Sequence, residues 1–436
     1  MYSTSNGRGL RIAIISPFSS WPSGSKTPIE QAQSLPYDNV SRACPGPTGV
    51  AADGTGSKLH TVRSLPLNFR EVSCFDESNW GDWRWQAQHS ATDLQALDKA
   101  LTLTDAERDG ASRAMAAGLP ISITPYYLAL CDPSDADCPI RRQCIPRAEE
   151  AIVVKGDLRD PLGEEAHEVA PHLIRRYPDR VLLVATDRCG VYCRFCTRSR
   201  LVGDGGGARS MAALEPAFAW IEAHPEVHDV IVSGGDPCVM STERLARLLR
   251  RLREIDHVDY VRLATRAPVT LPQRITEELC SAIRESHEAT WIMTHFNHPK
   301  ELTDEAFMAC ARLADAGLPV MNQTVLLRGV NDDPSTLEAL FRGLVRSRVR
   351  PYYLLQMDPV GGTGHLRTSV RRGIELMAAL QGRVSGIALP KLIVDTPGGL
   401  GKVPIGPNYL VSEEDGVTVL ETFRGDFVEY YDPPDL

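Results

Sequence analysis

Seven short apolar runs recur along the second half of the chain, and their spacing limits the fold more than any other feature of the sequence. Each run is long enough for one buried strand, and the stretches between them have the periodicity of amphipathic helices. Strands that alternate with helices are typical of a parallel sheet. We therefore expect an α/β domain whose sheet is closed or partly closed into a barrel. The runs span residues 181–185, 229–233, 260–264, 291–294, 319–327, 350–355 and 391–394.

Polar motifs follow six of these runs, directly after the predicted strand. In parallel barrels the catalytic groups collect at the carboxyl ends of the strands. The sequence therefore predicts one active site at that end of the barrel. The motifs are Cys189–Cys196, Gly234–Asp236, Thr265–Arg266, His295–His298, Gln356–Asp358 and Asp395.

Three cysteines, Cys189, Cys193 and Cys196, follow the first run with the spacing C-x3-C-x2-C. Three thiolates can hold three irons of a four-iron cluster, and the fourth iron then stays open to another ligand. A zinc site would need a fourth Cys or His nearby, and chance clustering of buried cysteines is the other alternative. Three arginines between residues 194 and 200 add positive charge that suits an anionic cluster, so we favour the cluster.

Two glycines, Gly234 and Gly235, end the second predicted strand and precede Asp236. A backbone without side chains lets a ligand approach closely, and the carboxylate of Asp236 could bind an ammonium group. A tight turn would use the same residues.

A second glycine motif surrounds Lys402, which follows Gly399 and Gly401 just after the last predicted strand. Most loop lysines are solvated, but a lysine in this setting can also form a Schiff base while glycine amides approach a phosphate. The spacing does not match a nucleotide-binding P-loop, because no Ser or Thr follows the lysine. Pyridoxal phosphate (PLP) is the cofactor that requires such a lysine.

The composition limits the kinds of partner that the protein can bind. A formal charge of −9 over 436 residues argues against a general binder of nucleic acid or of membrane surfaces. No apolar run approaches the roughly 18 residues of a membrane span, and residues 1–10 lack the apolar core of a signal peptide. Eleven cysteines without a disulfide-like rhythm favour a reducing cytoplasm. The expected partner is therefore a small molecule.

Four segments are expected along the chain. Residues 1–75 are rich in Ser, Pro and Gly and lack periodicity, which predicts a partly disordered extension. Residues 76–175 are predicted to be a helical segment, residues 176–375 the barrel, and residues 376–436 a C-terminal segment that carries the lysine. Within the barrel, Ser335–Glu338 has the pattern of a capping box and is expected to begin a helix.

From Trp80 to Tyr430 the chain resembles the lysine 2,3-aminomutases, which are radical S-adenosylmethionine (SAM) enzymes that also carry PLP. The resemblance implies a partial (β/α)6-type radical SAM barrel with an N-terminal helical segment and a C-terminal PLP-binding extension. It also implies an isomerase that forms homo-oligomers and receives electrons from an external donor of the flavodoxin or ferredoxin type. The tracts that carry the resemblance are Ile123–Tyr127, Arg176–Leu183, the cysteine loop, Ser233–Asp236, Leu271–Thr276, Thr294–Pro299, Leu326–Asn331, Arg348–Tyr353 and Val394–Tyr409.

The resemblance also assigns cofactor roles to residues. It makes the three cysteines the ligands of a [4Fe-4S] cluster and places the amino group of SAM at residues 234–236. It makes Lys402 the lysine that binds PLP, beside the two glycines named above. The PLP phosphate falls to Arg180, together with Arg176.

The substrate roles fall to one arginine and two acids. The resemblance places the substrate carboxylate on Arg198 and the far amino group of lysine on Asp358 and Asp395. Two close carboxylates repel each other unless a cation lies between them. Because the related glutamate mutases lack this pair of acids, an acidic substrate is disfavoured. The expected reaction moves the α-amino group of L-lysine to C3 and gives L-β-lysine.

Three alternatives remain. Leu355 stands where the lysine enzymes carry a tyrosine, so the pocket could be wider and accept L-arginine. A protein-modifying relative acts on a lysine of a translation factor, although the carboxylate site at Arg198 counts against this. A non-enzymatic iron-sulfur sensor would not need Lys402. The chain also ends without the cysteine-rich tail of the well-known lysine enzymes, so no structural zinc is predicted.

Overall fold

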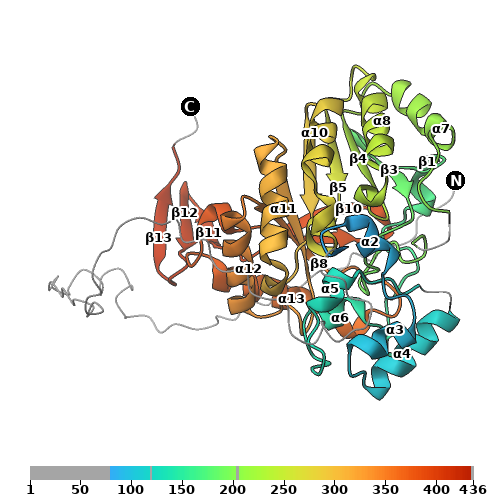
Figure 1. The fold of residues 1–436 in the computed structure, drawn as a ribbon. Helices are drawn as coiled ribbons and strands as arrows, with labels where there is room; N and C mark the ends of the chain where they lie inside the picture. Colours follow the sequence, from blue (N-terminus) through green and yellow to red (C-terminus); the bar gives the residue numbers. More distant parts are fainter. Residues whose placement is uncertain (1–78, 118–119, 203–205, 434–436) are drawn as a thin grey trace, which may run out of the picture. The chain divides into compact units, whose positions relative to one another are not determined.

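One sheet of ten strands organises the part of the chain that the structure describes (Figure 1). The structure is a computed structural model; it describes residues 79–117, 120–202 and 206–433, which all belong to one compact unit, Val62–Leu436. The predicted extension, residues 1–75, lies outside the described residues. The strands follow one another in chain order across the sheet. Their bounds are β1 Glu168–Ala170, β2 Leu173–Tyr177, β3 Arg180–Thr186, β4 Asp229–Gly234, β5 Tyr260–Ala264, β6 Thr290–Thr294, β7 Val320–Leu326, β8 Arg350–Gln356, β9 Lys391–Thr396 and β10 Gly401–Ile405.

Strands β3 to β9 pair in parallel, and a helix connects each of them to the next. Each apolar run predicted as a strand coincides with one of these strands, and the predicted α/β barrel class is confirmed. The arrangement gives six strand–helix units followed by a seventh parallel strand. The connecting helices are α7 Met211–Glu222, α8 Thr242–Arg253, α10 Glu277–Ser286, α11 Asp304–Asp315, α12 Pro334–Arg346 and α13 Val370–Leu380, with the short α9 Ala267–Thr270 before α10.

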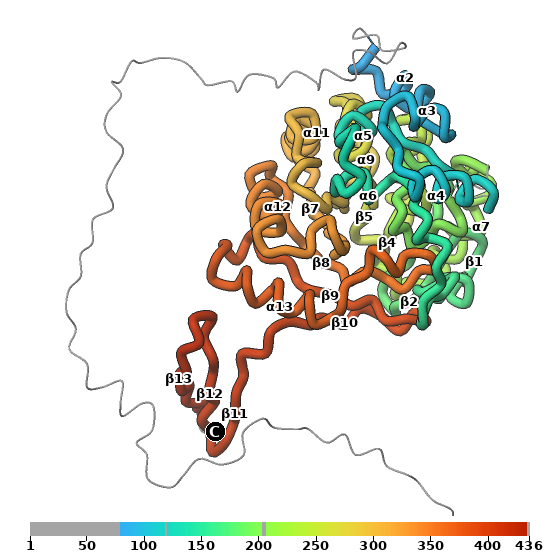
Figure 2. Tube along the Cα trace, turned by 90° about the horizontal axis from the view of Figure 1, so that it is seen from below, coloured from blue at the N-terminus to red at the C-terminus, as the bar shows by residue number. Residues whose placement is uncertain are grey.

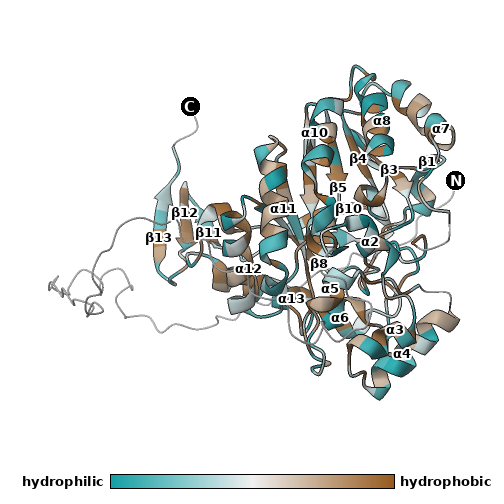
Figure 3. Ribbon diagram, viewed as in Figure 1, coloured by the Kyte–Doolittle hydropathy of each residue, from teal (hydrophilic) through white to brown (hydrophobic). Residues whose placement is uncertain are grey.

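Helix α8 shows why the connecting helices cover the sheet. Its buried leucines include Leu245, Leu248, Leu249 and Leu252, at steps of three and four residues that place them along one side of the helix. Ser241 caps the helix by accepting a hydrogen bond from a backbone N–H of the first turn. Figure 3 shows apolar strands inside and helices such as α8, α10 and α11 with both apolar and polar residues outside.

Helix α12 begins two residues earlier than the capping box at Ser335–Glu338 predicted, so the predicted start was wrong. The N-cap is Asp333, whose side chain accepts a hydrogen bond from the backbone N–H of Thr336 at 2.9 Å. Pro334 occupies the first helical position, where its missing N–H is not needed and its fixed φ suits the helix. The aspartate before the proline therefore takes the capping role that the sequence pattern assigned to Ser335.

The two ends of the sheet meet through side chains. Strand β10 turns back antiparallel on β9, and its register pairs Lys402 with Asp395. On β2, Arg176 Nη2 donates to Asp395 at 2.7 Å, and the hydroxyl of Tyr177 accepts the backbone N–H of Lys402 at 2.8 Å. Figure 2 shows β10 running back beside β2. These contacts complete the barrel between β10 and β2. Strand β2 pairs antiparallel with β3, and β1 pairs antiparallel with β2.

Two of the expected segment boundaries differ from the observed elements. The boundary between residues 375 and 376 falls inside α13, and the barrel sheet continues through β9 and β10. The expected helical segment, 76–175, also contributes β1 and the start of β2. The lysine segment is therefore an integral part of the barrel wall.

The N-terminal helices pack against the cysteine loop. Ile123 forms isolated β-bridges with Ala91 and with Val191, which lies between Cys189 and Cys193. It therefore ties this segment to the cysteine loop. Tyr126 and Tyr127 are buried in the main core. The helices are α2 Trp83–Gln88, α3 Leu94–Ala100, α4 Asp105–Ala116, α5 Pro125–Ala129 and α6 Arg141–Cys144.

A separate antiparallel sheet follows the barrel and leaves apolar side chains exposed. It consists of β11 Leu410–Glu414, β12 Val417–Glu421 and β13 Phe427–Tyr431. All five residues of β13 are exposed, including Phe427 at 61% and Tyr431 at 69%. A small sheet usually needs packing on one face for stability, and exposed apolar groups of this size mark an interaction surface.

Candidate active site

One cavity brings together most of the residues that the sequence singled out. Its volume is about 290 Å³, and we call it the central cavity. The cysteine loop, the carboxyl ends of several strands and Lys402 all contribute to its wall. The predicted residues that line it are Cys189, Cys193, Cys196, Arg198, Gly234, Gly235, Asp236, Leu355, Asp358, Asp395 and Lys402.

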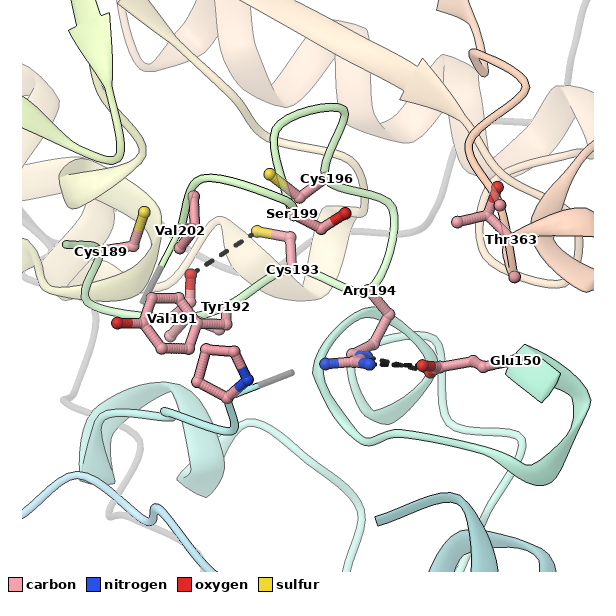
Figure 4. Close-up of a pocket in the computed structure, with 13 residues that line it drawn as sticks. Glu150, Cys189, Val191, Tyr192, Cys193, Arg194, Cys196, Ser199, Val202 and Thr363 are labelled. Atoms are coloured by element: carbon pink, nitrogen blue, oxygen red, sulfur yellow. Dashed lines mark hydrogen bonds and ion pairs between the residues drawn. The ribbon is translucent and has the colours of Figure 1, made fainter. Parts of the chain in front are cut away.

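The cysteine loop presents its three sulfur atoms to one region. Figure 4 shows the sulfurs of Cys189, Cys193 and Cys196 near one another, while Arg194 points away and pairs with Glu150. Burial, followed by the charge of the neighbouring Cys193, raises the pKa of Cys196 to about 11. All three cysteines line the central cavity, and a bound metal would deprotonate their thiols. The donor set therefore fits a cluster held by three cysteines.

The glycines after β4 serve the backbone of the cysteine loop. A Cβ on Gly234 would lie 2.3 Å from the carbonyl oxygen of Thr186, and one on Gly235 would lie 2.3 Å from that of Arg188. Gly234 also has φ +118°, a value that favours glycine. Close approach of another backbone segment, more than of a ligand, therefore explains why glycine stands at these two positions.

Asp236 accepts three hydrogen bonds from the protein at the edge of the central cavity. Its buried carboxylate accepts hydrogen bonds from the hydroxyl of Thr265 at 2.7 Å and from the backbone N–H groups of Cys238 and Arg266 at 2.9 and 2.8 Å. These three donors all come from the fold, and Asp236 also lines the central cavity, so its role toward the amino group of SAM stays a prediction. Its hydrogen bonds hold the ends of β4 and β5 together.

Lys402 lies beside Asp395 in an ion pair between Nζ and Oδ2. Arg176 occupies the other oxygen of the same carboxylate, at 2.7 Å. Burial alone would raise the pKa of Asp395, but Lys402 and Arg176 outweigh it and hold the pKa below its usual value. Asp395 is therefore an ionised group that already carries two cationic partners.

The glycines before Lys402 line neither of the cavities described here. Gly399 has φ +80°, and a Cβ there would lie 2.8 Å from the carbonyl oxygen of Leu162. Gly401 has φ +108°, and its carbonyl accepts the hydroxyl of Thr396 at 2.7 Å. These glycines form the turn that returns β10 onto β9, and their approach to a phosphate stays a prediction.

A second cavity of about 200 Å³ adjoins the central one and shares Arg198, Asp395 and Lys402 with it. We call it the arginine cavity, because four guanidinium groups contribute to its wall. Convergent arginines next to a lysine suit a phosphorylated ligand. The residues that define it are Arg176, Arg180, Arg198, Arg262, Tyr177, Tyr353 and Lys402.

The two predicted phosphate ligands differ in availability. Arg176 is held by the buried Asp395, whereas Arg180 pairs with the exposed Asp179 and keeps 36% of its side chain exposed. The sequence missed Arg262, which projects from β5 and pairs with Asp229 at 2.7 Å. Its signal was only an arginine within an apolar strand, which sequence spacing does not connect to the lysine.

Arg198 pairs with a buried acid, Glu164, that no sequence motif predicted. Glu164, whose side chain is 3% exposed, binds Arg198 with Oε1 2.7 Å from Nη2 and 2.8 Å from Nε. It also accepts from Arg200 at 3.2 Å. These two arginines outweigh burial and lower the pKa of Glu164. Arg198 Nη1 donates to the hydroxyl of Ser233 at 3.3 Å, so the guanidinium is fixed while part of its edge still faces both cavities.

Asp358 lines the central cavity, and its pKa is raised far above the usual value of an aspartate. Burial, followed by the charge of Asp395, raises its pKa to about 7, although Lys402 and two arginines oppose the shift. One acid of the pair is thus ionised and the other titrates near neutrality. A cationic ligand between them would favour the ionised form of both.

Sequence comparisons place the chain. The Radical SAM superfamily model matches residues 183–340, and the Lysine-2,3-aminomutase model matches residues 377–436. The L-lysine 2,3-aminomutase of Clostridium subterminale is 45% identical over 365 residues, which cover 84% of this chain and 86% of the relative. The chain belongs to the lysine 2,3-aminomutase family. The Bacillus subtilis L-lysine 2,3-aminomutase is 42% identical over 82% of this chain and 75% of its own length.

Membership confirms several expectations. Lysine 2,3-aminomutases are isomerases, the radical SAM family implies a [4Fe-4S] cluster and SAM, and lysine 2,3-aminomutases use PLP as well. The family also includes a relative named glutamate 2,3-aminomutase, from Clostridioides difficile, which is 42% identical over 82% of this chain and 84% of its own length. Overall identity therefore does not decide the substrate. Among the described helices, none is long and apolar enough to cross a bilayer.

Proposed function

We propose that this chain is a PLP-dependent radical SAM 2,3-aminomutase that moves the α-amino group of a basic L-amino acid to C3, with L-lysine as the favoured substrate. The observation that carries the proposal is the central cavity, whose wall includes the three cysteines, Lys402 and two acids. Radical chemistry at the cysteine loop and chemistry at the lysine nitrogen must reach the same substrate, so they must share one space.

The cofactors supply the radical and the carbonyl that the reaction needs, and the protein supplies the position. The three cysteines would hold the cluster through thiolates. Lys402 would hold PLP through Nζ, and Arg180, which keeps 36% of its side chain exposed, would bind its phosphate in the arginine cavity. Arg176 would keep Asp395 oriented, because these two residues already pair.

The substrate is held at both ends by charge. Arg198, fixed by Glu164 and Ser233, would bind the α-carboxylate through its remaining edge. Asp358 and Asp395 would bind the cationic end. Asp395 would exchange the Lys402 ammonium for that of the substrate once the lysine nitrogen carries PLP. An acidic side chain would instead add a third negative charge to this place, and we therefore do not expect glutamate as a substrate.

L-Arginine is the second candidate, because Leu355 lines the central cavity at the position where the lysine enzymes carry a tyrosine. A leucine leaves room beside the two acids for a guanidinium, which pairs well with carboxylates. Lysine remains favoured because the curated relatives include several named for it.

Two further partners belong to this proposal. The exposed apolar residues of β13 would be covered by a second copy of the chain in a homo-oligomer. The cluster would receive its electron from an external donor of the flavodoxin or ferredoxin type. The nine described cysteines are free thiols, and together with the cluster they suit a reducing cytoplasm.

The test is turnover by the reconstituted protein under anaerobic conditions. Iron, sulfide, PLP, SAM and a reductant are supplied, and L-lysine, L-arginine and L-glutamate labelled with ¹⁵N at the α-amine are compared. We expect the label at C3 of a basic amino acid and no product from glutamate. No product from either basic amino acid would refute the proposal. Retained PLP absorbance and turnover in Lys402→Ala would refute the assignment of Lys402.

A further inference from the structure

Arg266 lies against the cysteine loop, and its guanidinium donates hydrogen bonds to groups of the protein. It follows β5 and precedes α9, and only 9% of its side chain is exposed. Its Nη1 lies 2.7 Å from the sulfur of Cys193, and its Nε donates to the carbonyl of His295 at 3.1 Å. Asp236 accepts its backbone N–H at 2.8 Å. The guanidinium is therefore anchored at both ends beside one of the three cysteines.

Glu301 fixes the charge of this guanidinium. Its side chain is fully buried, and Oε1 accepts from Arg266 Nη2 and from the hydroxyl of Tyr127, both at 2.8 Å. Oε2 accepts the backbone N–H groups of Asn297 at 2.6 Å and His298 at 3.0 Å. Because both carboxylate oxygens are engaged, Glu301 cannot turn away, and the arginine stays cationic at a fixed distance from the sulfur.

A buried ion pair of this kind is weak evidence for a role in stability, because apolar residues of similar volume often serve equally well. A specific effect of the positive charge explains better why an arginine lies at position 266. The group nearest the Nη1 donor is a sulfur that faces the central cavity, where the cluster would lie. Hydrogen bonds to ligating sulfurs and nearby charge are among the factors that set the reduction potential of an iron-sulfur cluster.

We propose that Arg266 raises the reduction potential of the cluster held by the three cysteines. The inference rests on the cluster assignment of the proposed function and goes beyond it. Reduction adds one electron from the external donor to a cluster that its thiolates already make anionic, and no bond to Arg266 forms or breaks. A fixed positive charge favours the more negative, reduced form. The hydrogen bond to Cys193 acts in the same direction.

The consequence concerns which donors can reduce this enzyme. A higher potential lets the cluster accept an electron from a weaker reductant of the flavodoxin or ferredoxin type. Arg266 is a positioning and tuning residue in this account, because it contacts a cluster ligand and not the substrate. Its effect is therefore measured on the cluster itself and does not depend on turnover.

The experiment measures the midpoint potential of the reconstituted cluster in the full chain. Each protein is titrated with dithionite and mediators without SAM, and the electron paramagnetic resonance signal of the reduced cluster is followed. The double variant Arg266→Gln with Glu301→Gln removes both charges without leaving Glu301 unpaired. We expect its equilibrium constant for reduction to fall at least tenfold, a shift of about 59 mV to lower potential for one electron. Arg266→Lys keeps the charge and should fall between this variant and the parent.

A matched control is available at Arg141, which is fully buried and pairs with Glu107 at 2.6 Å. Its other hydrogen bonds go to carbonyl groups in the N-terminal segment. The variant Arg141→Gln with Glu107→Gln should keep the parent potential.

Three results would overturn the role of Arg266. These are an unchanged potential in Arg266→Gln/Glu301→Gln, an equal shift in the Arg141 control, and loss of the cluster from Arg266 variants that keep the parent circular dichroism. A parent protein that assembles no cluster would instead refute the cluster assignment. The two failures are therefore distinguishable by the iron and sulfide content of the parent.

Discussion

Replacing Asp358 by asparagine removes one of the two carboxylates from the central cavity and leaves a side chain of nearly the same size. The other acid, Asp395, already carries Arg176 as a partner at 2.7 Å. The charge available to a cationic substrate therefore comes largely from Asp358. Truncation of one partner of a buried charge pair costs about 2–5 kcal/mol, and for the partly exposed Asp358 we take about 2–3 kcal/mol. KM for L-lysine should then rise about 30- to 150-fold.

The same residue predicts a pH dependence. Its pKa is raised to about 7, so in the free protein the carboxyl group is protonated below that pH and must lose its proton before it can bind a cation. Affinity for the substrate should therefore fall as the pH is lowered through 7. Competition by one proton with this pKa weakens binding about tenfold between pH 8 and pH 6. The variant Asp358→Asn should lack this component.

The assay is the initial rate of β-amino acid formation by the reconstituted enzyme under anaerobic conditions, with the product separated by chromatography. KM is determined for parent and variant at pH 6, 7 and 8, and the ratio of the two values isolates the contribution of Asp358. Asp157→Asn is the control, since Asp157 is 3% exposed and pairs with Arg367 outside both cavities. Equal KM values for parent and Asp358→Asn, or a ratio that does not change with pH, would contradict the placement of the substrate cation.

Three other substitutions test the remaining parts of the site and the assembly. Lys402→Ala should lose the visible absorbance of bound PLP while it keeps the iron and the absorbance of the cluster; loss of both would indicate misfolding of the barrel wall. Glu164→Gln should raise KM about tenfold with a smaller effect on kcat, because Arg198 loses a charged hydrogen-bond partner, and Glu164→Asp should restore part of the affinity. A decrease in kcat alone would argue against this role. Phe427→Ser combined with Tyr430→Ser should reduce the mass measured by light scattering, and an unchanged mass would exclude β13 from the oligomer interface.

Local patterns carried the prediction of the barrel. An apolar run of five residues bounded by polar motifs, such as 181–185, identifies a buried strand without reference to distant residues, and β3 coincides with it. The cysteine spacing is equally local, because one short loop carries all three sulfurs. The capping box at Ser335–Glu338 failed for a local reason as well, since Asp333 and Pro334 offered a better N-cap and first helical residue two positions earlier.

Predictions that depended on which residues lie next to each other in the folded chain were less complete. The resemblance placed Arg176 near a phosphate, and only the structure shows that it pairs with Asp395, which lies 219 residues away in the chain. The glycines beside Asp236 and Lys402 were read as openings for ligands, and the structure uses them for turns and for close backbone contacts. A glycine is required by any close neighbour, and the sequence does not say whether that neighbour is a ligand or the protein itself.

The sequence by itself determined the seven parallel strands and the cysteine loop, because these depend on periodicity and spacing within short segments, whereas the cofactor roles of most residues came from the family resemblance. The tertiary structure alone decided the charge partners: Glu164 with Arg198 across 34 residues, and Arg266 with Cys193 across 73. Such pairs form only where the closing of the sheet brings strand ends and loops together. Burial there leaves each charge dependent on the partner that the fold supplies.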